Sequence, residues 1–341
     1  MKKIQFAGSR VIKTGVAIYL TAWICELLDW PPVFAVITAI VTIEPTVSDS
    51  IKKGIIRFPA SAIGSAYAVL FISLFGNSPI TYTLAAVFTI ATCFKLKLHA
   101  GLLVATLTAV AMVEVIHSNF LISFFIRLGT TTTGLLVSTA VNMFILPADY
   151  TKEIIRSLQS NAKDTGVLIE KVFNGLLDNK RKGNIDVKEM VLNLDKQTKR
   201  IEMLTRFQKD DTKYHPLIES EKTTFLNTEK QFIQLRLIQY HLNNVVNTHL
   251  LGISLSQDEK DIIKHAVKEL ADSLQNPANY SEDRHQIQLE LLMKQFWEDN
   301  EEITTKNEQH PTYFTPEIII LYELVSIFNL VTKFYLDGQN N

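Results

Sequence analysis

Long apolar stretches fill the first 147 residues of the chain, and amphipathic helical patterns fill the rest. Six apolar segments precede Ala148, with Pro, Gly, Asn or charged residues between them, over residues 11–28, 32–43, 58–75, 79–94, 100–116 and 120–146. A helix of about 20 mostly apolar residues crosses a bilayer, because no backbone polar group stays unpaired in lipid. The pattern predicts a six-span transmembrane helix bundle over residues 1–147.

The second region, residues 148–341, shows helical periodicity throughout. We expect an all-helical cytoplasmic domain with helices near residues 150–178, 185–209, 217–250, 256–275, 282–302 and 315–337. The whole chain is thus predicted to be all-α. The last segment is apolar but contains Glu317, Glu323 and Lys333, which favours a buried bundle helix; the alternative is a seventh span.

The charge distribution supports two regions in two different solvents. Residues 1–147 contain ten basic and five acidic residues, whereas residues 148–341 contain 24 and 30. This asymmetry excludes a single soluble globular domain, and the acidic second region argues against nucleic-acid binding. We found no phosphate-binding glycine loop, no hydrolase motif and no metal spacing among the histidines, so no enzyme activity, metal or cofactor is expected.

Basic residues alternate between the predicted loops. The N-terminus carries Lys2, Lys3 and Arg10, the loop after the second segment carries Lys52, Lys53 and Arg57, and the loop after the fourth carries Lys95 and Lys97. The loops around Asp29, Asn77 and Ser118 carry no Lys or Arg. Because basic loops stay in the cytoplasm, we expect both termini in the cytoplasm of a multi-pass cell-membrane protein.

An internal repeat relates residues 32–64 to residues 102–134 at an offset of 70. The identical pairs are Ala35/Ala105, Thr38/Thr108, Ala39/Ala109, Glu44/Glu114, Ser48/Ser118, Arg57/Arg127 and Gly64/Gly134. The alternative is chance similarity between apolar segments. A true repeat of three helices would enter the membrane from opposite sides, which is how many transporters are built around a site between their two halves.

Charged residues at membrane depth are candidate sites. Glu44 and Arg57 are 13 residues apart across a helix hairpin, and Glu114 and Arg127 repeat this arrangement. The functional interpretation is a pair of gates, or an anion site at Arg with a protonatable Glu beside it. The alternative is two structural ion pairs that fix the packing of the hairpins.

Four further residues are secondary candidates. Lys13 and Glu26 lie near opposite ends of the first segment, where snorkelling to the membrane surface explains both; a role in the pathway is the alternative. Thr130 and Thr131 follow Arg127 in a run of four threonines. They serve either close helix packing or the wall of a polar pathway.

The stretch Arg127-Leu128-Gly129-Thr130-Thr131-Thr132-Thr133-Gly134, followed by Val141-Asn142-Met143-Phe144-Ile145-Leu146-Pro147, resembles the aromatic acid exporter and fusaric acid resistance superfamily. The architecture is similar to the half-length Gram-positive type with a helical C-terminal domain. The resemblance implies proton-driven efflux of aromatic carboxylates. The first copy departs from the motif, with Arg57-Phe58-Pro59-Ala60, which argues against one shared role for the two arginines.

Two functions are compatible with these features. The first is a secondary exporter of small aromatic or amphipathic organic acids, in which Arg57 or Arg127 holds the carboxylate and Glu44 or Glu114 carries the proton. The second is a membrane-anchored scaffold or sensor whose cytoplasmic bundle binds a partner or ligand. Longer members of the resembled superfamily carry two membrane halves, so we expect a homodimer; a monomer is the alternative.

Overall fold

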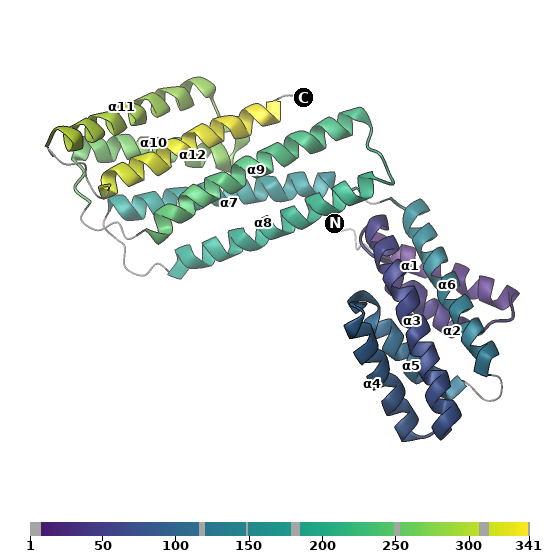
Figure 1. Cartoon of the computed structure of the whole chain (residues 1–341). Helices are drawn as coiled ribbons and strands as arrows, with labels where there is room; N and C mark the ends of the chain where they lie inside the picture. Colours follow the sequence, from purple (N-terminus) through teal and green to yellow (C-terminus); the bar gives the residue numbers. More distant parts are fainter. Residues whose placement is uncertain are drawn as a thin grey trace. The chain divides into compact units, whose positions relative to one another are not determined.

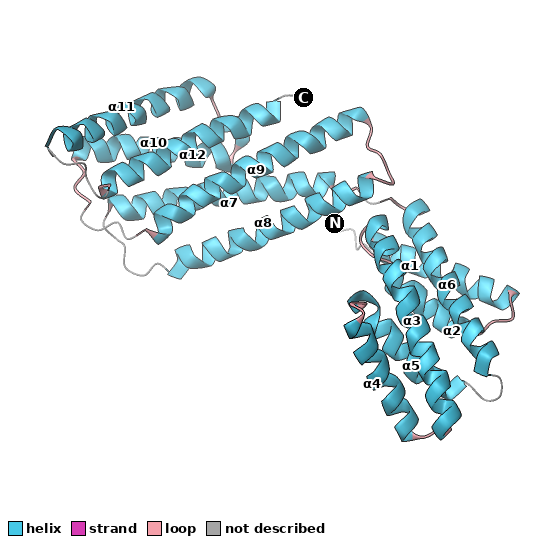
Figure 2. Cartoon of the chain, viewed as in Figure 1, coloured by secondary structure: helices cyan, strands magenta, loops and turns pink. Residues whose placement is uncertain are grey.

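The computed structural model describes residues 8–115, 120–147, 149–178, 185–248, 253–306 and 314–339. These ranges contain twelve α-helices and no strand (Figures 1 and 2), so the predicted all-α class is confirmed. The chain divides into two compact units: Met1–Asp149 with Phe207–Pro216, and Tyr150–Arg206 with Leu217–Asn341. The loop around Ser118, one of the predicted outer loops, lies outside the described residues.

Six α-helices form the body of the first unit. They are α1 (Ser9–Leu27), α2 (Pro32–Thr42), α3 (Val47–Phe75), α4 (Pro79–Lys95), α5 (Leu102–Val115) and α6 (Phe120–Phe144). Helix α3 packs against α4, α5 and α6, and helix α6 packs against α1, α2 and α3. Five of the six helices match the predicted segments to within two residues at each end.

Helix α3 begins eleven residues earlier than predicted. Thr46 caps it by accepting a hydrogen bond from the backbone nitrogen of Asp49 at 3.1 Å. The charged stretch around Lys52 and Lys53, which the sequence predicts to be a loop, is therefore helical, and Pro59 lies inside the helix. Because Lys53 and Arg57 are four residues apart on a helix, they share one face, which positions both cations for the site described below.

Close helix packing in the first unit depends on two glycines. A Cβ atom at Gly64 on α3 would overlap the backbone carbonyl oxygen of Ala105 on α5. A Cβ atom at Gly134 on α6 would likewise overlap the carbonyl oxygen of Ala35 on α2. Small residues at such crossings let helix backbones approach closely.

We expect Gly64→Ala and Gly134→Ala each to destabilise the first unit by about 1–3 kcal/mol. The new methyl group meets a backbone carbonyl, which, unlike a side chain, cannot change its rotamer to make room. Gly54→Ala on the same helix as Gly64 is the control, since its Cβ would lie 3.7 Å from a Leu135 methyl group, an ordinary contact. Thermal unfolding in detergent measures the effect. Equal stability of the Gly64 and Gly54 variants would contradict the packing described.

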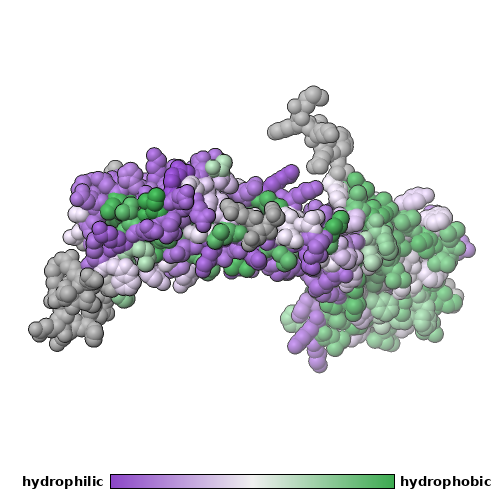
Figure 3. Space-filling view, turned by 90° about the horizontal axis from the view of Figure 1, so that it is seen from above, coloured by the Kyte–Doolittle hydropathy of each residue, from purple (hydrophilic) through white to green (hydrophobic). Residues whose placement is uncertain are grey.

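The surface of the first unit is mostly apolar, and that of the second is mostly hydrophilic (Figure 3). Large apolar side chains are exposed on the first unit, among them Leu27, Leu74, Phe94, Leu121, Leu136 and Phe144. Such continuous exposure indicates a surface that water does not cover. Among the described helices, α3, α6 and Pro316–Gly338 are long and apolar enough to cross a membrane, and α2, α4 and His99–Glu114 are shorter apolar helices.

Six α-helices form the second unit around one core. They are α7 (Thr151–Leu177), α8 (Ile185–Thr212), α9 (Glu219–Asn247), α10 (Gln257–Gln275), α11 (Glu282–Lys306) and α12 (Pro316–Gln339). The core includes the fully buried Phe173, Leu235 and Phe328. On α9, Phe232, Leu235, Ile238 and Leu242 recur at helical spacing and are buried. This apolar stripe therefore faces the interior of the bundle.

Helix α12 belongs to the core of the second unit. Its residues Leu324 and Phe328 are fully buried, and it packs against α9 and α11. Its buried Glu323 lies 2.5 Å from Nδ1 of His241 and accepts a hydrogen bond from Asn244 at 3.1 Å. A carboxylate that is satisfied within the bundle favours the interpretation of α12 as a bundle helix over a seventh span.

The second unit contains a buried histidine, His285, with one ring nitrogen unpartnered among the described residues. Nε2 of His285 donates to the carbonyl oxygen of Phe328 at 3.0 Å, and Nδ1 has no partner in the described part of the chain. Burial lowers the pKa of His285, although the Phe328 carbonyl and Glu269 act in the opposite direction. The neutral ring is therefore the form that the folded unit accommodates.

We expect the second unit to lose stability as the pH falls below about 6.5, where His285 of the unfolded chain binds a proton and the folded one does not. The dependence contributed by this residue is at most about 1.4 kcal/mol per pH unit. His285→Gln should flatten the profile by this amount. Urea unfolding followed by circular dichroism from neutral to mildly acidic pH tests this, and identical profiles for both proteins would contradict it.

Candidate functional site

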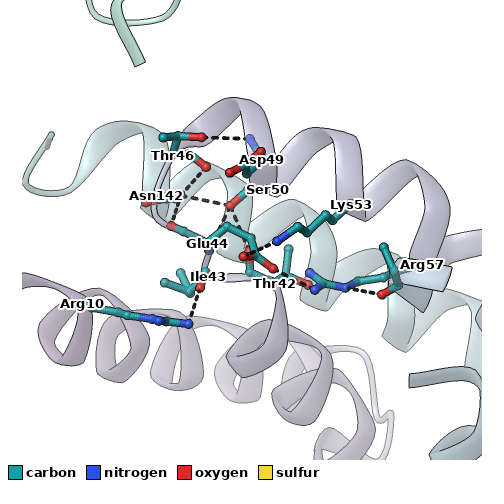
Figure 4. A network of polar contacts seen from close by, with 11 residues as sticks. Arg10, Thr42, Ile43, Glu44, Thr46, Asp49, Ser50, Lys53, Arg57 and Asn142 are labelled. Atoms are coloured by element: carbon teal, nitrogen blue, oxygen red, sulfur yellow. Dashed lines mark hydrogen bonds and ion pairs between the residues drawn. The ribbon is translucent and has the colours of Figure 1, made fainter. Parts of the chain in front are cut away.

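An ion pair between the partly buried Glu44 and the buried Arg57 joins the connection after α2 to helix α3 (Figure 4). The carboxylate of Glu44 accepts hydrogen bonds from Nη2 of Arg57 and from Nζ of Lys53, both at 2.8 Å. Nε of Arg57 also donates to the carbonyl oxygen of Ala100 at 3.3 Å. The structure thus contains the Glu44–Arg57 pair expected from the 13-residue spacing, with Lys53 as a second cation.

Asn142 on α6 connects this pair to two other helices. Its amide nitrogen lies 3.0 Å from the carbonyl oxygen of Glu44, 3.2 Å from that of Thr46 and 2.9 Å from the Ser50 hydroxyl (Figure 4). Its amide oxygen accepts a hydrogen bond from Nζ of Lys13 at 2.8 Å. One buried amide therefore fixes α1, α6 and the α2–α3 connection together. Asn142 belongs to the family-like stretch over residues 141–147, but its spacing from these partners does not predict the contacts.

Lys13 does not snorkel, contrary to the prediction. Its side chain is buried, and its ammonium group is held by the amide oxygen and the backbone carbonyl of Asn142. A buried cation costs less free energy when such acceptors replace its water. Glu26, at the other end of α1, is exposed, as snorkelling predicts.

The prediction of a second ion pair, between Glu114 and Arg127, is wrong. Glu114 is exposed on α5 and accepts a hydrogen bond from the Tyr82 hydroxyl. Arg127 on α6 donates to the Thr108 hydroxyl instead. Within the described residues, no ion pair involves Arg127. The two copies of the sequence pattern therefore hold their arginines in different electrostatic surroundings.

Arg127 is a buried cation beside a small cavity. Only 5% of the residue is exposed, and Nε and Nη1 have no hydrogen-bond partner in the described part of the chain. The guanidinium carbon lies 4.3 Å from the centroid of the Phe34 ring, a cation–π geometry. The cavity has a volume of about 80 Å³ and is lined by Pro31, Phe34, Met112, Ser123, Ile126, Arg127 and Thr130.

The two candidate threonines have different positions. Thr130 lines the Arg127 cavity, and its hydroxyl donates to the carbonyl oxygen of Arg127 at 3.0 Å. The Thr131 hydroxyl lies 3.2 Å from that of Ser61 on α3. Thr130 is therefore placed to form part of a binding site, whereas Thr131 joins two helices.

The end of α8 contributes to the first unit. Nε2 of His215 lies 2.6 Å from the carbonyl oxygen of Met143, and Nδ1 lies 3.0 Å from the carboxylate of Asp211. Asp211 is itself buried. The segment Phe207–Pro216 thus covers the carbonyl at the C-terminal end of α6, which has no partner within its own helix.

A surface of exposed apolar helices with buried, hydrogen-bonded cations inside defines a helical membrane protein. Residues 5–145 match the sequence profile described as aromatic acid exporter family member 1. The chain belongs to the aromatic acid exporter family.

Relatives of known sequence align along almost the entire chain. A UPF0421 protein of Oceanobacillus iheyensis is 49% identical over 98% of this chain and 97% of its own length. Another from Bacillus cereus is 42% identical over 98% and 94%, and one from Staphylococcus saprophyticus is 35% identical over 94% and 96%. These proteins therefore share both regions of the chain and not the apolar region alone.

Proposed function

We propose that the protein is a secondary exporter of small aromatic or amphipathic organic acids and that Arg127 binds their carboxylate. One observation carries the proposal: a buried guanidinium with two free donor nitrogens faces a cavity and has no ion-pair partner among the described residues. An unpaired buried charge is costly, and an anionic ligand removes that cost by supplying the missing charge and acceptors.

The surroundings of Arg127 support an aromatic substrate. Phe34, Met112 and Ile126 present apolar surface to the same cavity as the guanidinium. An aromatic carboxylate combines a flat apolar ring with one terminal charge. The cavity of about 80 Å³ has room for the carboxylate group beside the guanidinium, and the apolar side chains next to it would contact the ring. The family description supports the same class of substrate.

Glu114 is the better candidate of the two acids for proton coupling. Glu44 is held by two cations, which favours its ionised form, and a carboxylate so held is a poor proton carrier. Glu114 is exposed, and its described partner is the neutral Tyr82. In the proposed mechanism, a proton that enters on Glu114 is exchanged for the acid that leaves.

The helix contacts of the first unit support an inverted repeat. In the register offset by 70 residues, Gly64 corresponds to Gly134 and Ala35 to Ala105. Gly64 packs on Ala105 and Gly134 on Ala35, so the contacts exchange when the copies exchange. The facing hydroxyls of Ser61 and Thr131 are 70 residues apart. Such exchange is expected for two copies around a two-fold axis, with alternating access between them.

The proposed exporter has six spans with both termini in the cytoplasm, because Lys and Arg occur in alternate loops only. We expect Asn77→Cys to react in intact cells with a thiol reagent that does not cross membranes, and Lys95→Cys to react only after permeabilisation. The native Cys25 and Cys93 are buried and are replaced by Ala in both variants. Labelling of position 95 in intact cells would overturn the proposed orientation.

A homodimer completes the proposal. A unit of six helices is a small enclosure for a solute pathway, and two copies with one orientation require a two-fold axis along the membrane normal. The particle mass in nanodiscs should correspond to two chains. A single chain per particle, together with retained transport, would leave the monomer as the functional form.

Growth of a deletion strain tests the function. We expect the strain to be more sensitive to a panel of aromatic acids, such as benzoate, 4-hydroxybenzoate and cinnamate, than the same strain carrying the gene. A plasmid encoding Arg127→Gln should not restore resistance, although its product reaches the membrane. Equal sensitivity to every acid with and without the gene would contradict the proposal for this class of substrates.

A further inference from the structure

The second unit contains a cavity that the export function does not use. It has a volume of about 430 Å³ and lies among α7, α9, α12 and the end of α10. Its floor is apolar and includes Leu158, Ala162 and Leu274, which are buried. Cavities that bind drug-sized molecules have volumes of about 300–1,000 Å³ and mostly apolar linings.

One wall of the cavity is a fixed pair of aromatic rings. The rings of Tyr280 and Tyr335 are stacked, with centroids 3.9 Å apart and planes 14° apart. The Tyr335 hydroxyl donates to the carbonyl oxygen of Ser273 at 2.5 Å, which locks this ring in place. Phe334 also lines the cavity. A wall that is already ordered binds a planar molecule without a further loss of side-chain entropy.

The polar part of the lining is neutral. It consists of amides and hydroxyls, contributed by Gln159, Thr224, Asn227, Thr228, Gln231 and Tyr280. The lining contains no Asp, Glu, Lys, Arg or His. Amides and hydroxyls both donate and accept hydrogen bonds, whereas an anionic ligand would lose its water here without meeting a cation of the lining.

We propose that this cavity is a binding site for a neutral, planar aromatic molecule that carries an amide or hydroxyl group. Such a ligand stacks its ring against the tyrosine wall and directs its polar group to the amides of α7 and α9. The site differs in ligand charge from the Arg127 cavity, where a cation favours an anion. It gives the second unit a small-molecule ligand of its own.

Fluorine NMR on the full-length protein in detergent tests the charge preference. The two probes are 4-fluorobenzamide, which is neutral, and 4-fluorobenzoate, which is anionic at neutral pH and otherwise nearly the same shape. We expect saturable line broadening of the benzamide. Thr224→Trp places a bulky ring in the mouth of the cavity and should weaken benzamide binding at least tenfold.

The matched control is Thr223→Trp, whose side chain is on the same helix, exposed and not part of the lining. It should bind the benzamide as the wild type does. Gln159 on α7 is exposed and also lines the cavity, so Gln159→Trp is a second blocked variant in case Thr224→Trp does not fold. Benzoate binding at Arg127 does not interfere, because only the signal that Thr224→Trp or Gln159→Trp removes is assigned to this cavity.

The proposal fails if the benzamide does not broaden, or if broadening is the same in the two blocked variants and in Thr223→Trp. It also fails if the blocked variants remove as much benzoate binding as benzamide binding, because the site would then not select the neutral form. Either result is independent of whether the first unit transports aromatic acids.

Discussion

Arg127→Gln is expected to reduce aromatic acid export roughly a hundredfold, because the carboxylate loses a charge-assisted contact of about 3 kcal/mol. The same substitution should leave the protein as stable as the wild type or more stable. It removes a buried charge that has no ion-pair partner among the described residues, and such a charge is destabilising. Export by the reconstituted protein and thermal unfolding in detergent measure the two effects.

Arg57→Gln is the matched control, since Arg57 occupies the corresponding position in the proposed repeat. Arg57 is paired with Glu44 at 2.8 Å, so its loss leaves the partly buried Glu44 carboxylate with Lys53 alone and should lower stability. Arg127→Lys, which keeps the charge but not the planar group, should transport with a raised KM. Unchanged KM in Arg127→Gln would remove Arg127 from the binding site.

Asn142→Leu is expected to destabilise the first unit by about 3–5 kcal/mol. The substitution leaves the Lys13 ammonium buried without the amide oxygen that lies 2.8 Å away. It also removes the donor to the carbonyl oxygens of Glu44 and Thr46. The size of the effect follows from the loss of one partner of a buried charge, which costs more than the loss of both.

The double variant Lys13→Met, Asn142→Leu separates these causes. Removing the cation as well should restore a large part of the lost stability, because two contacting residues are not additive. Thermal unfolding of both single variants and the double variant in detergent gives the interaction free energy between Lys13 and Asn142. If the double variant is no more stable than Asn142→Leu, the Lys13–Asn142 contact is not what holds these helices.

The sequence predicts helix ends well where Pro or Gly residues stand directly at the boundary. Trp30-Pro31-Pro32 and the Gly76–Pro79 stretch end and begin helices in both the prediction and the structure. The predicted start of α3 is eleven residues too late, because Lys52, Lys53 and Arg57 interrupt the apolar run, although Thr46 is a cap residue by type. These charged residues lie within the helix and do not mark a loop before it.

The candidate site was predictable only where it is local. Glu44 and Arg57 are close in sequence and form an ion pair, so the 13-residue spacing was enough to predict their contact. The same spacing predicts an ion pair between Glu114 and Arg127, and this prediction is wrong. The partner of each side chain depends on how the neighbouring helices pack and not on the spacing alone. Asn142 and the segment Phe207–Pro216 act across about 70 to 130 residues of sequence, and no periodicity signals such contacts.

Transport by the purified protein in liposomes tests the central claim most directly. Liposomes loaded with radiolabelled 4-hydroxybenzoate at neutral pH, with an acidic medium outside, should release the label quickly. With the Arg127→Gln protein, release should slow to the rate of labelled liposomes that contain no protein. Release from wild-type liposomes should slow to the same rate when the pH difference is removed. Release at the same rate with the wild-type protein, the Arg127→Gln protein and no protein would contradict export of aromatic acids through the Arg127 site.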